Sequence, residues 1–248
     1  MAEPTPLGVT VVIPVHNEAD YLPTALPLLF EEMARVEADV TVVIAENGST
    51  DDSARIVKEA TASYPALDLM ELPTPDYGAA MRDGFLAADT EWVVNFDIDY
   101  FSADFLNAAL ALADRADIVL ASKRAEGSDD QRGAWRRLGT WTFNQILRYG
   151  LGSGVSDTHG MKLVRRSVVD DIGPSVISTV DLFDTELVVR AEQAGYRIVE
   201  LPANVEELRE TNSSLVKRVP RTLKGIWRIR QSMRGDAPSA AERRPPID

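Results

Sequence analysis

The sequence contains no cysteine, and His16 and His159 are the only histidines among its 248 residues. Disulfide bonds, thiolate nucleophiles and cysteine metal sites are therefore excluded, and any metal ion must be held mainly by oxygen ligands. No stretch approaches the roughly 18 consecutive apolar residues that a membrane-spanning helix needs. Residues 1–8 carry neither basic charge nor an apolar targeting segment, so we expect the protein to remain in the cytoplasm.

The glycine-rich loops that bind phosphates in two large classes of nucleotide-binding proteins are also absent. No G-x-G-x-x-G follows the first apolar run, and no G-x-x-x-x-G-K-[ST] occurs anywhere. A nicotinamide cofactor and an ATP-binding P-loop are therefore not indicated. If the chain binds a nucleoside diphosphate, the charge of the diphosphate must instead be neutralised by a metal ion and by basic side chains. The candidate basic side chains are Arg82, Lys123, Arg124, Arg136, Arg137 and Arg209.

Apolar runs alternate with amphipathic segments along the first half of the chain. The runs predict strands, and the segments between them predict helices. Strands that are apolar on both faces and separated by helices are typical of a parallel sheet with right-handed crossovers. We therefore predict an α/β fold with a mostly parallel central sheet flanked by helices, and ligands at the carboxyl ends of the strands. The predicted strands are 9–15, 40–45, 67–72, 92–96 and 118–121, and the predicted helices are 21–36, 50–64, 77–88 and 105–113.

Two carboxylates, those of Asp97 and Asp99, directly follow the fourth predicted strand. On an extended backbone, positions two apart face the same side, so we expect these oxygen donors to converge at the end of the strand. Such a pair suits a divalent cation that bridges the phosphates of a nucleotide. The alternative is that the acidic pair merely opens a solvated loop before the next helix.

Basic residues gather near the carboxyl terminus of an otherwise acidic chain. The net charge is −13; residues 209–234 hold eight basic and one acidic side chain, residues 235–248 hold two and three, and residues 1–208 therefore carry −19. Between 215 and 233, apolar and basic residues alternate with helical spacing, which predicts a basic amphipathic helix. Such a helix, with Trp227 at the interface, suits an anionic membrane surface better than nucleic acid. The alternative is that its apolar residues pack on the core.

The changes in composition divide the chain into three parts. We predict the main α/β domain over residues 8–210, the basic amphipathic helix over 211–234 and a disordered tail over 235–248.

Several motifs occur in the order and spacing of the family 2 glycosyltransferases, which this chain resembles. They are PVHNE at 14–18, ENGSTD at 46–51, GAAMRDG at 78–84 and DID at 97–99. Later stretches at 157–163, 183–187 and 195–202 resemble the polyprenyl-phosphate branch of that family, which includes enzymes similar to dolichol-phosphate mannose synthase. Each motif alone is weak evidence, whereas all of them in register form a strong signal.

The resemblance implies a GT-A fold, a nucleoside-diphosphate sugar as donor and a Mg²⁺ or Mn²⁺ ion as cofactor. Asp97 and Asp99 map onto the metal-binding D-x-D motif, with Asp99 as the direct ligand. Glu46-Asn47 stands where family members commonly have Asp-Asp or Asp-Asn, so both UDP-hexose and GDP-hexose remain open. The donor-binding residues implied in this way, with the basic candidates beside them, are Pro14, Asn17, Glu18, Glu46, Asn47, Ser49, Arg82, Asp97 and Arg124.

The nature of the acceptor decides which other side chains the reaction needs. A lipid phosphate is already anionic and needs cations more than a base, whereas an alcohol needs a general base. The candidates to bind a lipid phosphate are Arg136, Arg137, Lys162, Arg209 and the hydroxyls of Ser213 or Ser214. For an alcohol, Asp157 or Glu186 would be the base. Together with the metal-binding position, the candidate catalytic residues are therefore Asp99, Asp157, Glu186 and Arg209.

These observations predict an inverting hexosyltransferase that moves a hexose from a nucleoside-diphosphate sugar to a polyprenyl phosphate. We expect it to act peripherally at the inner face of the cell membrane and not to bind nucleic acid. The sequence leaves open whether it forms a homodimer. One alternative keeps the donor chemistry and uses a soluble acceptor, either a phosphorylated metabolite or a glycan. Two others are a sugar-phosphate nucleotidyltransferase and a donor-binding protein without activity.

Overall fold

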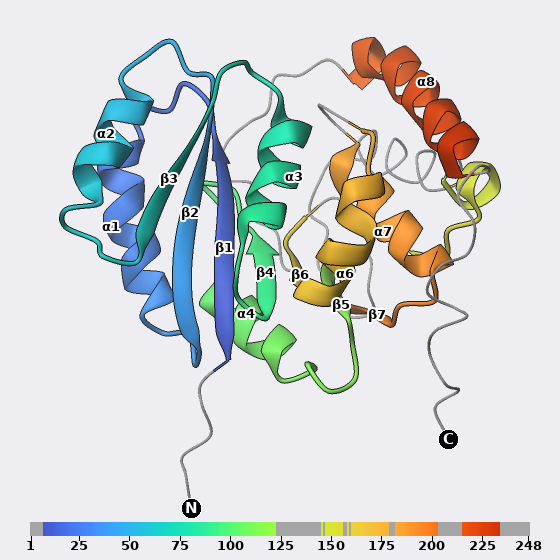
Figure 1. The fold of residues 1–248 in the computed structure, drawn as a ribbon, viewed down its shortest axis with the longest axis horizontal. Coiled ribbons are helices and arrows are strands. Elements are labelled where there is room, and N and C mark those ends of the chain that lie inside the picture. The colour runs from blue at the N-terminus through green and yellow to red at the C-terminus, as the bar shows by residue number, and fades with distance from the viewer. Residues whose placement is uncertain are drawn as a thin grey trace, which may run out of the picture.

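A seven-stranded sheet forms the centre of the molecule, in the order β3-β2-β1-β4-β6-β5-β7 (Figure 1). The computed structural model describes residues 7–122, 145, 147–155, 158, 160–178, 182–202 and 215–233, the last range without the side chains of 215–221. β6 runs antiparallel to both of its neighbours, and all other pairs are parallel. The strands are β1 (Gly8–Val15), β2 (Asp39–Asn47), β3 (Leu67–Leu72), β4 (Trp92–Asn95), β5 (Ile118–Ser122), β6 (Lys162–Arg165) and β7 (Ile198–Pro202).

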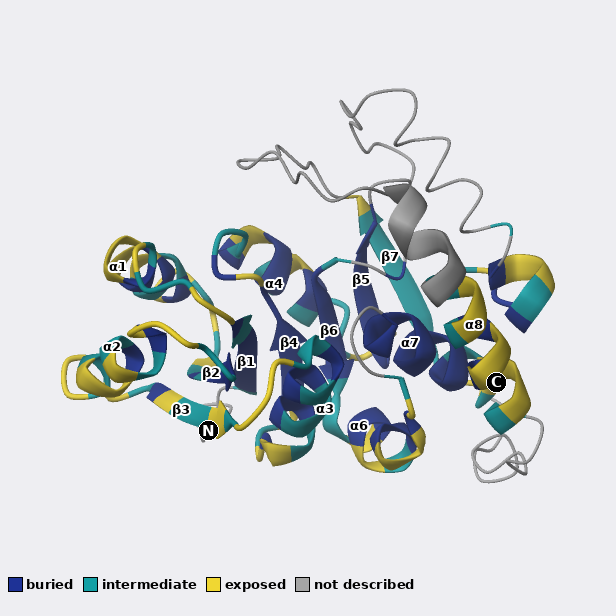
Figure 2. Cartoon of the chain, turned by 90° about the horizontal axis from the view of Figure 1, so that it is seen from above, coloured by how far each residue is buried: buried dark blue, intermediate teal, exposed yellow. Residues whose placement is uncertain are grey.

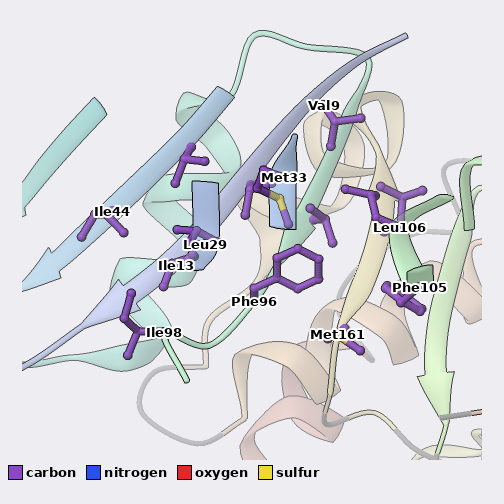
Figure 3. Close-up of a cluster of buried hydrophobic side chains, with 14 of the residues drawn as sticks. Val9, Ile13, Leu29, Met33, Ile44, Phe96, Ile98, Phe105, Leu106 and Met161 are labelled. Carbon is purple, nitrogen blue, oxygen red and sulfur yellow. The ribbon is translucent and has the colours of Figure 1, made fainter. Parts of the chain in front are cut away.

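Helices cover both faces of this sheet, as parallel strands require (Figure 2). On one face, α1, α2 and α4 pack against alternate residues of β1, from Val9 to Val15; on the other face, α3, α6 and α7 pack around Val12. Side chains on the two faces of β1 thus pack in two separate cores, and Figure 3 shows part of the first. The helices are α1 (Leu22–Met33), α2 (Ser53–Ala60), α3 (Tyr77–Ala87), α4 (Ala103–Leu110), α6 (Arg166–Ile172), α7 (Phe183–Gln193) and α8 (Leu215–Met233), with a 3-10 turn at Gly173–Ser175.

The register of the strands brings their carboxyl ends to one edge of the sheet. Val15 of β1 lies opposite Glu46 of β2, and Val12 of β1 lies opposite Asn95 of β4. The loops that follow β1, β2, β3 and β4 therefore emerge side by side, at the edge where α/β sheets bind ligands.

The predicted α/β fold is confirmed, including the mostly parallel sheet. All five predicted strands are present, and their ends differ from the prediction by at most two residues. The prediction did not include β6, which is short and begins and ends with a basic residue, or the edge strand β7. The reversed direction of β6 makes the sheet mixed.

A third and smaller core lies where α7, the helical residues 147–151 and α8 meet. It contains Leu147, Leu151, Leu182, Val189, Ile226 and Ile229. Part of the apolar side of the basic helix therefore packs on the body of the protein. No helix in the described part of the chain is both long and apolar enough to span a membrane. The expected tail at 235–248 lies outside the described residues, and the division at residue 210 stays a prediction.

Candidate functional site

The loops after β1 and β2 are held together through the side chain of Asn17. Its backbone has a φ of 55°, in the left-handed region that asparagine tolerates better than most residues. The backbone N–H of Asn17 donates to Ser49 Oγ at 2.9 Å, and the N–H of Thr50 donates to Asn17 Oδ1 at 2.8 Å. The two loops therefore form one unit whose geometry depends on Asn17.

His16 adds a second connection between the same loops. Its Nδ1 lies 2.8 Å from the carbonyl oxygen of Asn47, and its Nε2 lies 3.1 Å from Nδ2 of Asn17. A carbonyl oxygen only accepts, so Nδ1 carries the ring hydrogen and Nε2 accepts from the amide. The sequence analysis did not assign His16 to the site, although its position between Pro14 and Asn17 in the first motif was a signal.

The end of β2 connects this unit to the loop after β3. Glu46 and Asn47 are buried; the N–H of Ser49 donates to Glu46 Oε1, and the N–H of Asp76 donates to Asn47 Oδ1 at 2.6 Å. Asp76 Oδ1 in turn accepts from the N–H of Ala79 at 3.0 Å and so caps the start of α3. The carboxylate and amide at the end of β2 thus shape the loop after β2 and connect it to the loop after β3.

Asp51 ties the loop after β1 to the start of α2. Its carboxylate accepts from the hydroxyl and the N–H of Ser53 and from the N–H of Ala19, while the N–H of Glu18 donates to Ser53 Oγ. The hydrogen bond from the Ser53 hydroxyl is the main cause that lowers the pKa of Asp51 below its ordinary value. Asp51 therefore stays ionised at neutral pH and fixes the backbone beside Glu18.

The acidic pair after β4 lies on a tight turn, which corrects the expectation of an extended strand. The N–H of Asp97 donates to the carbonyl oxygen of Tyr100 at 3.1 Å, and the N–H of Tyr100 donates back at 3.0 Å. Asp97 is exposed, Asp99 is half-buried, and Ile98 between them is buried beside Phe96 and Ile13 (Figure 3). Ile98 therefore anchors a closed turn that presents both carboxylates at the edge of the sheet.

The acidic turn fits a divalent cation that is shared with a diphosphate. Mg²⁺ is usually held by one or two carboxylates, with phosphate oxygens and water completing its shell. Asp97 and Asp99 supply oxygen donors on a backbone fixed by two hydrogen bonds. Within the described residues, no group of three or more His, Cys, Asp or Glu side chains could hold a metal ion. Two carboxylates leave the other positions around such an ion to phosphate oxygens and water.

A buried polar cluster lies directly behind this turn. Lys162, the first residue of β6, is fully buried, and its Nζ donates to Asp184 Oδ1 at 2.7 Å, to the carbonyl oxygen of Gly160 at 2.8 Å and to Asn95 Oδ1 at 3.1 Å. Tyr77, at the start of α3, donates its hydroxyl to Asp184 Oδ2 at 3.2 Å. Asn95 is the last residue of β4, so the cluster joins β4, β6, α3 and α7 beneath the acidic turn.

Two residues that the sequence predicted to act on the acceptor, Lys162 and Glu186, form ion pairs inside the protein. Lys162 faces Asp184 rather than solvent. Glu186 is fully buried; it accepts from the N–H groups of Ile177 and Ser178 and pairs with Arg190 Nε at 2.7 Å. Both side chains thus have partners inside the protein, and their roles toward an acceptor, Lys162 as a phosphate-binding cation and Glu186 as a base, stay predictions.

Arg82 lies on α3, is half-buried and donates from Nε to Asp83 at 3.0 Å. Pro14 is half-buried at the end of β1. The remaining candidates lie outside the described residues; they are Lys123, Arg124, Arg136, Arg137, Asp157, Arg209, Ser213 and Ser214.

Gly48 provides a test of the loop unit. Its φ is +62°, and an added Cβ would lie 2.8 Å from backbone atoms of Thr74 and Pro75. At Gly195 the φ is +81° and an added Cβ meets nothing within 4 Å. Gly195→Ala should lower the free energy of unfolding by about 1–2 kcal/mol through backbone strain alone. Gly48→Ala should lower it by at least about 1 kcal/mol more because of the clash. Urea unfolding measures both; equal losses would contradict the close approach of these loops.

The Lys162–Asp184 pair predicts a strongly non-additive response. Lys162→Met leaves a buried carboxylate without its cation and should cost about 3–5 kcal/mol of unfolding free energy. The double change Lys162→Met with Asp184→Leu should recover a large part of that loss. Arg166→Met, which breaks the exposed pair with Asp170, is the control and should cost at most about 1 kcal/mol. Urea unfolding at neutral pH is the measurement, and a double variant as unstable as the sum of its single changes would refute this account.

Comparison with known proteins agrees with this arrangement. The family model for glycosyl transferase family 2 matches residues 10–173. An uncharacterised glycosyltransferase of Mycobacterium tuberculosis (strain ATCC 25618 / H37Rv) is 34% identical over 197 residues, which cover 78% of this chain and 83% of that protein. The undecaprenyl-phosphate 4-deoxy-4-formamido-L-arabinose transferase of Pseudomonas savastanoi pv. phaseolicola is 29% identical over 166 residues, which cover 65% of this chain and 48% of that protein.

Solved structures share the fold. Glucosyl-3-phosphoglycerate synthase from Mycobacterium tuberculosis, in complex with Mn²⁺, UDP and glucosyl-3-phosphoglycerate, has a TM-score of 0.63 at 17% identity and covers 89% of this chain and 80% of its own. A mannosyltransferase from Pyrobaculum calidifontis, in complex with GDP-Man and Mn²⁺, has a TM-score of 0.62 at 21% identity, with coverages of 94% and 66%. At these identities the likeness establishes the GT-A fold and no more.

The family match removes the reason to consider a nucleotidyltransferase. It runs from the first strand to the end of α6 and includes the three joined loops, the third-helix motif and the acidic turn. The protein therefore belongs to glycosyl transferase family 2 and is a glycosyltransferase that uses a nucleotide sugar.

Proposed function

We propose that this glycosyltransferase transfers a hexose from a nucleoside-diphosphate sugar to a polyprenyl phosphate, with inversion and with a divalent cation at Asp97 and Asp99. The observation that carries the proposal is the position of the acidic turn. It emerges beside the loops after β1, β2 and β3, which hydrogen bonds hold as one unit. A nucleoside held by the loops would therefore direct its diphosphate toward the two carboxylates.

On the donor side, the residues divide into those that hold the loops and those that face outward. Glu46 and Asn47 are buried and use side-chain oxygens to fix Ser49 and Asp76, so their part is to shape the nucleoside site. Pro14, Asn17, Glu18 and Ser49 are more exposed on that unit. We assign contact with the nucleoside to this second group and charge compensation for the diphosphate to Arg82, with Arg124 in the same role.

Asp97 and Asp99 would hold the Mg²⁺ or Mn²⁺ ion. A cation bound there would neutralise the negative charge that builds on the departing diphosphate. The protein's own contribution is rigidity: the Asp97–Tyr100 turn and the buried Ile98 keep both carboxylates in place before the donor arrives. Burial also raises the pKa of the Tyr100 phenol, at the end of the turn, above its ordinary value.

The acceptor proposal is supported by the relative that acts on undecaprenyl phosphate. A phosphate oxygen is already ionised, so its attack on the anomeric carbon needs cations that bind and orient it rather than a base. We assign that role to Arg136, Arg137, Arg209 and Ser213. The second candidate is a soluble phosphorylated acceptor, as in the solved synthase that carries glucosyl-3-phosphoglycerate. If the acceptor were an unphosphorylated alcohol, Asp157 would be the base.

Asp99→Asn tests the cation site. Loss of one carboxylate should lower kcat by at least about a hundredfold, because several kcal/mol of stabilisation of the leaving group depend on it. Asp89→Asn, which changes an exposed aspartate before β4 at the opposite edge of the sheet, is the matched control and should leave kcat unchanged. Both variants should unfold at the wild-type urea concentration. An active Asp99→Asn enzyme would place the ion elsewhere or make it unnecessary.

The donor and the acceptor can be identified in one assay. UDP- and GDP-hexoses labelled in the sugar are incubated with Mn²⁺ and either a short polyprenyl phosphate or 3-phosphoglycerate. We expect one nucleotide sugar to give label that extracts into organic solvent only with the polyprenyl phosphate, and a chelator to abolish it. Label that stays in water and depends on 3-phosphoglycerate would favour the soluble acceptor, and hydrolysis without transfer to either would contradict both.

A further inference from the structure

α8 is held on the body of the protein by one side only. Ile226 and Ile229 are buried against α7 and residues 147–151, and Arg190 of α7 donates from Nη2 to Ser232 Oγ at 2.9 Å. At Gly225 the helix approaches so closely that an added Cβ would lie 2.2 Å from Leu182 Cδ1. The rotation of α8 about its axis is therefore fixed, and so is the face that it turns outward.

The outward face combines large apolar side chains with basic ones. Leu223 and Trp227 are one helical turn apart, and 45% and 58% of their surfaces are exposed. The neighbouring basic residues Lys224, Arg228 and Arg230 are also exposed, and Figure 2 shows exposed stretches along α8. Ile226 and Trp227 are adjacent in sequence but lie on different sides of the helix, with Ile226 packed inside and Trp227 outside. Leu223 and Trp227 therefore form an apolar stripe that does not pack in the core.

The segment that packs against α8 carries an exposed aromatic side chain of its own. Tyr149 is 80% exposed, and its neighbour Gly150 packs against α8, where an added Cβ would lie 3.6 Å from Ile226 Cγ2. Exposed aromatic rings beside basic residues are the composition that binds the interface of a membrane, where rings enter the headgroup region and basic groups meet lipid phosphates.

We propose that the outward face of α8 docks on an anionic lipid surface through Trp227 and Leu223, with Lys224, Arg228 and Arg230 on the lipid headgroups. Charge complementarity favours this occupant. Residues 1–208 carry −19 and are repelled by such a surface, whereas residues 209–234 carry +7. The attraction therefore acts at α8 and orients the whole molecule. The inference rests on the proposed function only in that a lipid acceptor must be reached at a membrane.

Vesicle sedimentation of the full chain, without donor or polyprenyl phosphate, tests the docking. We expect binding to vesicles of phosphatidylcholine mixed with phosphatidylglycerol, and little binding to phosphatidylcholine alone. Replacing Lys224, Arg228 and Arg230 together by Gln should weaken binding by about a hundredfold, since each basic residue near the surface contributes about fivefold. The matched control replaces Arg35, Arg55 and Lys58, which lie on or beside α1 and α2, by Gln and should leave binding unchanged.

Trp227→Ser tests the apolar part, with Leu28→Ser on α1 as the control, because Leu28 is similarly exposed at 48%. Only the α8 variant should lose binding. In wild-type protein, lipids with brominated acyl chains should quench tryptophan fluorescence, and Trp227→Phe should remove most of that quenching. Thermal unfolding of each variant shows whether it is folded.

Three outcomes would overturn the proposal. They are wild-type protein that stays off anionic vesicles, binding that both sets of α8 changes leave intact, and a dimer in solution that Trp227→Ser dissociates, which would assign this face to a second copy. None of these outcomes bears on transfer to a detergent-dispersed or soluble acceptor. Failure of docking and failure of the proposed function are therefore separate results.

Discussion

The buried ion pair between Lys162 and Asp184 is the interaction on which the site depends. It fixes the reversed strand β6 to α7 and, through Asn95 and Tyr77, to the ends of β4 and the beginning of α3. A lysine and a carboxylate out of contact with water are stable only when each satisfies the other, so the pair tolerates few alternative arrangements. The acidic turn begins two residues after Asn95, so the same ion pair also restricts the position of the turn.

Hydrogen bonds from backbone N–H groups to side-chain oxygens fix the loops after β1, β2 and β3 in a similar way. Asn17, Asn47 and Asp51 each use side-chain oxygens to satisfy backbone N–H groups of a neighbouring loop, which loops otherwise leave to water. A nucleotide therefore meets a surface whose shape is set in advance. Less conformational entropy is lost when such a surface binds its ligand, which favours tight and selective recognition.

The sequence predicted the strands that are apolar on both faces and the identity of the residues at their ends. It did not predict β6, because Lys162 and Arg165 made a buried strand look like a loop, and the partner that neutralises Lys162 lies on a distant helix. The period-two argument placed Asp97 and Asp99 correctly at the end of β4 but assumed an extended chain. What closes the turn is the burial of Ile98, a tertiary contact that spacing does not encode. His16 was overlooked because its role depends on loops far apart in sequence.

The direction of β6 decides which end of that strand lies beside the acidic turn. Because β6 is antiparallel to β5, the chain leaves β5 at Ser122 and enters β6 at Lys162 along the same edge of the sheet, the edge that carries the acidic turn. The reversed strand thus begins, rather than ends, at the edge where α/β sheets bind ligands. Its first residue, Lys162, is therefore the one that supplies a buried cation beneath the acidic turn, and the basic residue at its other end, Arg165, lies at the opposite edge.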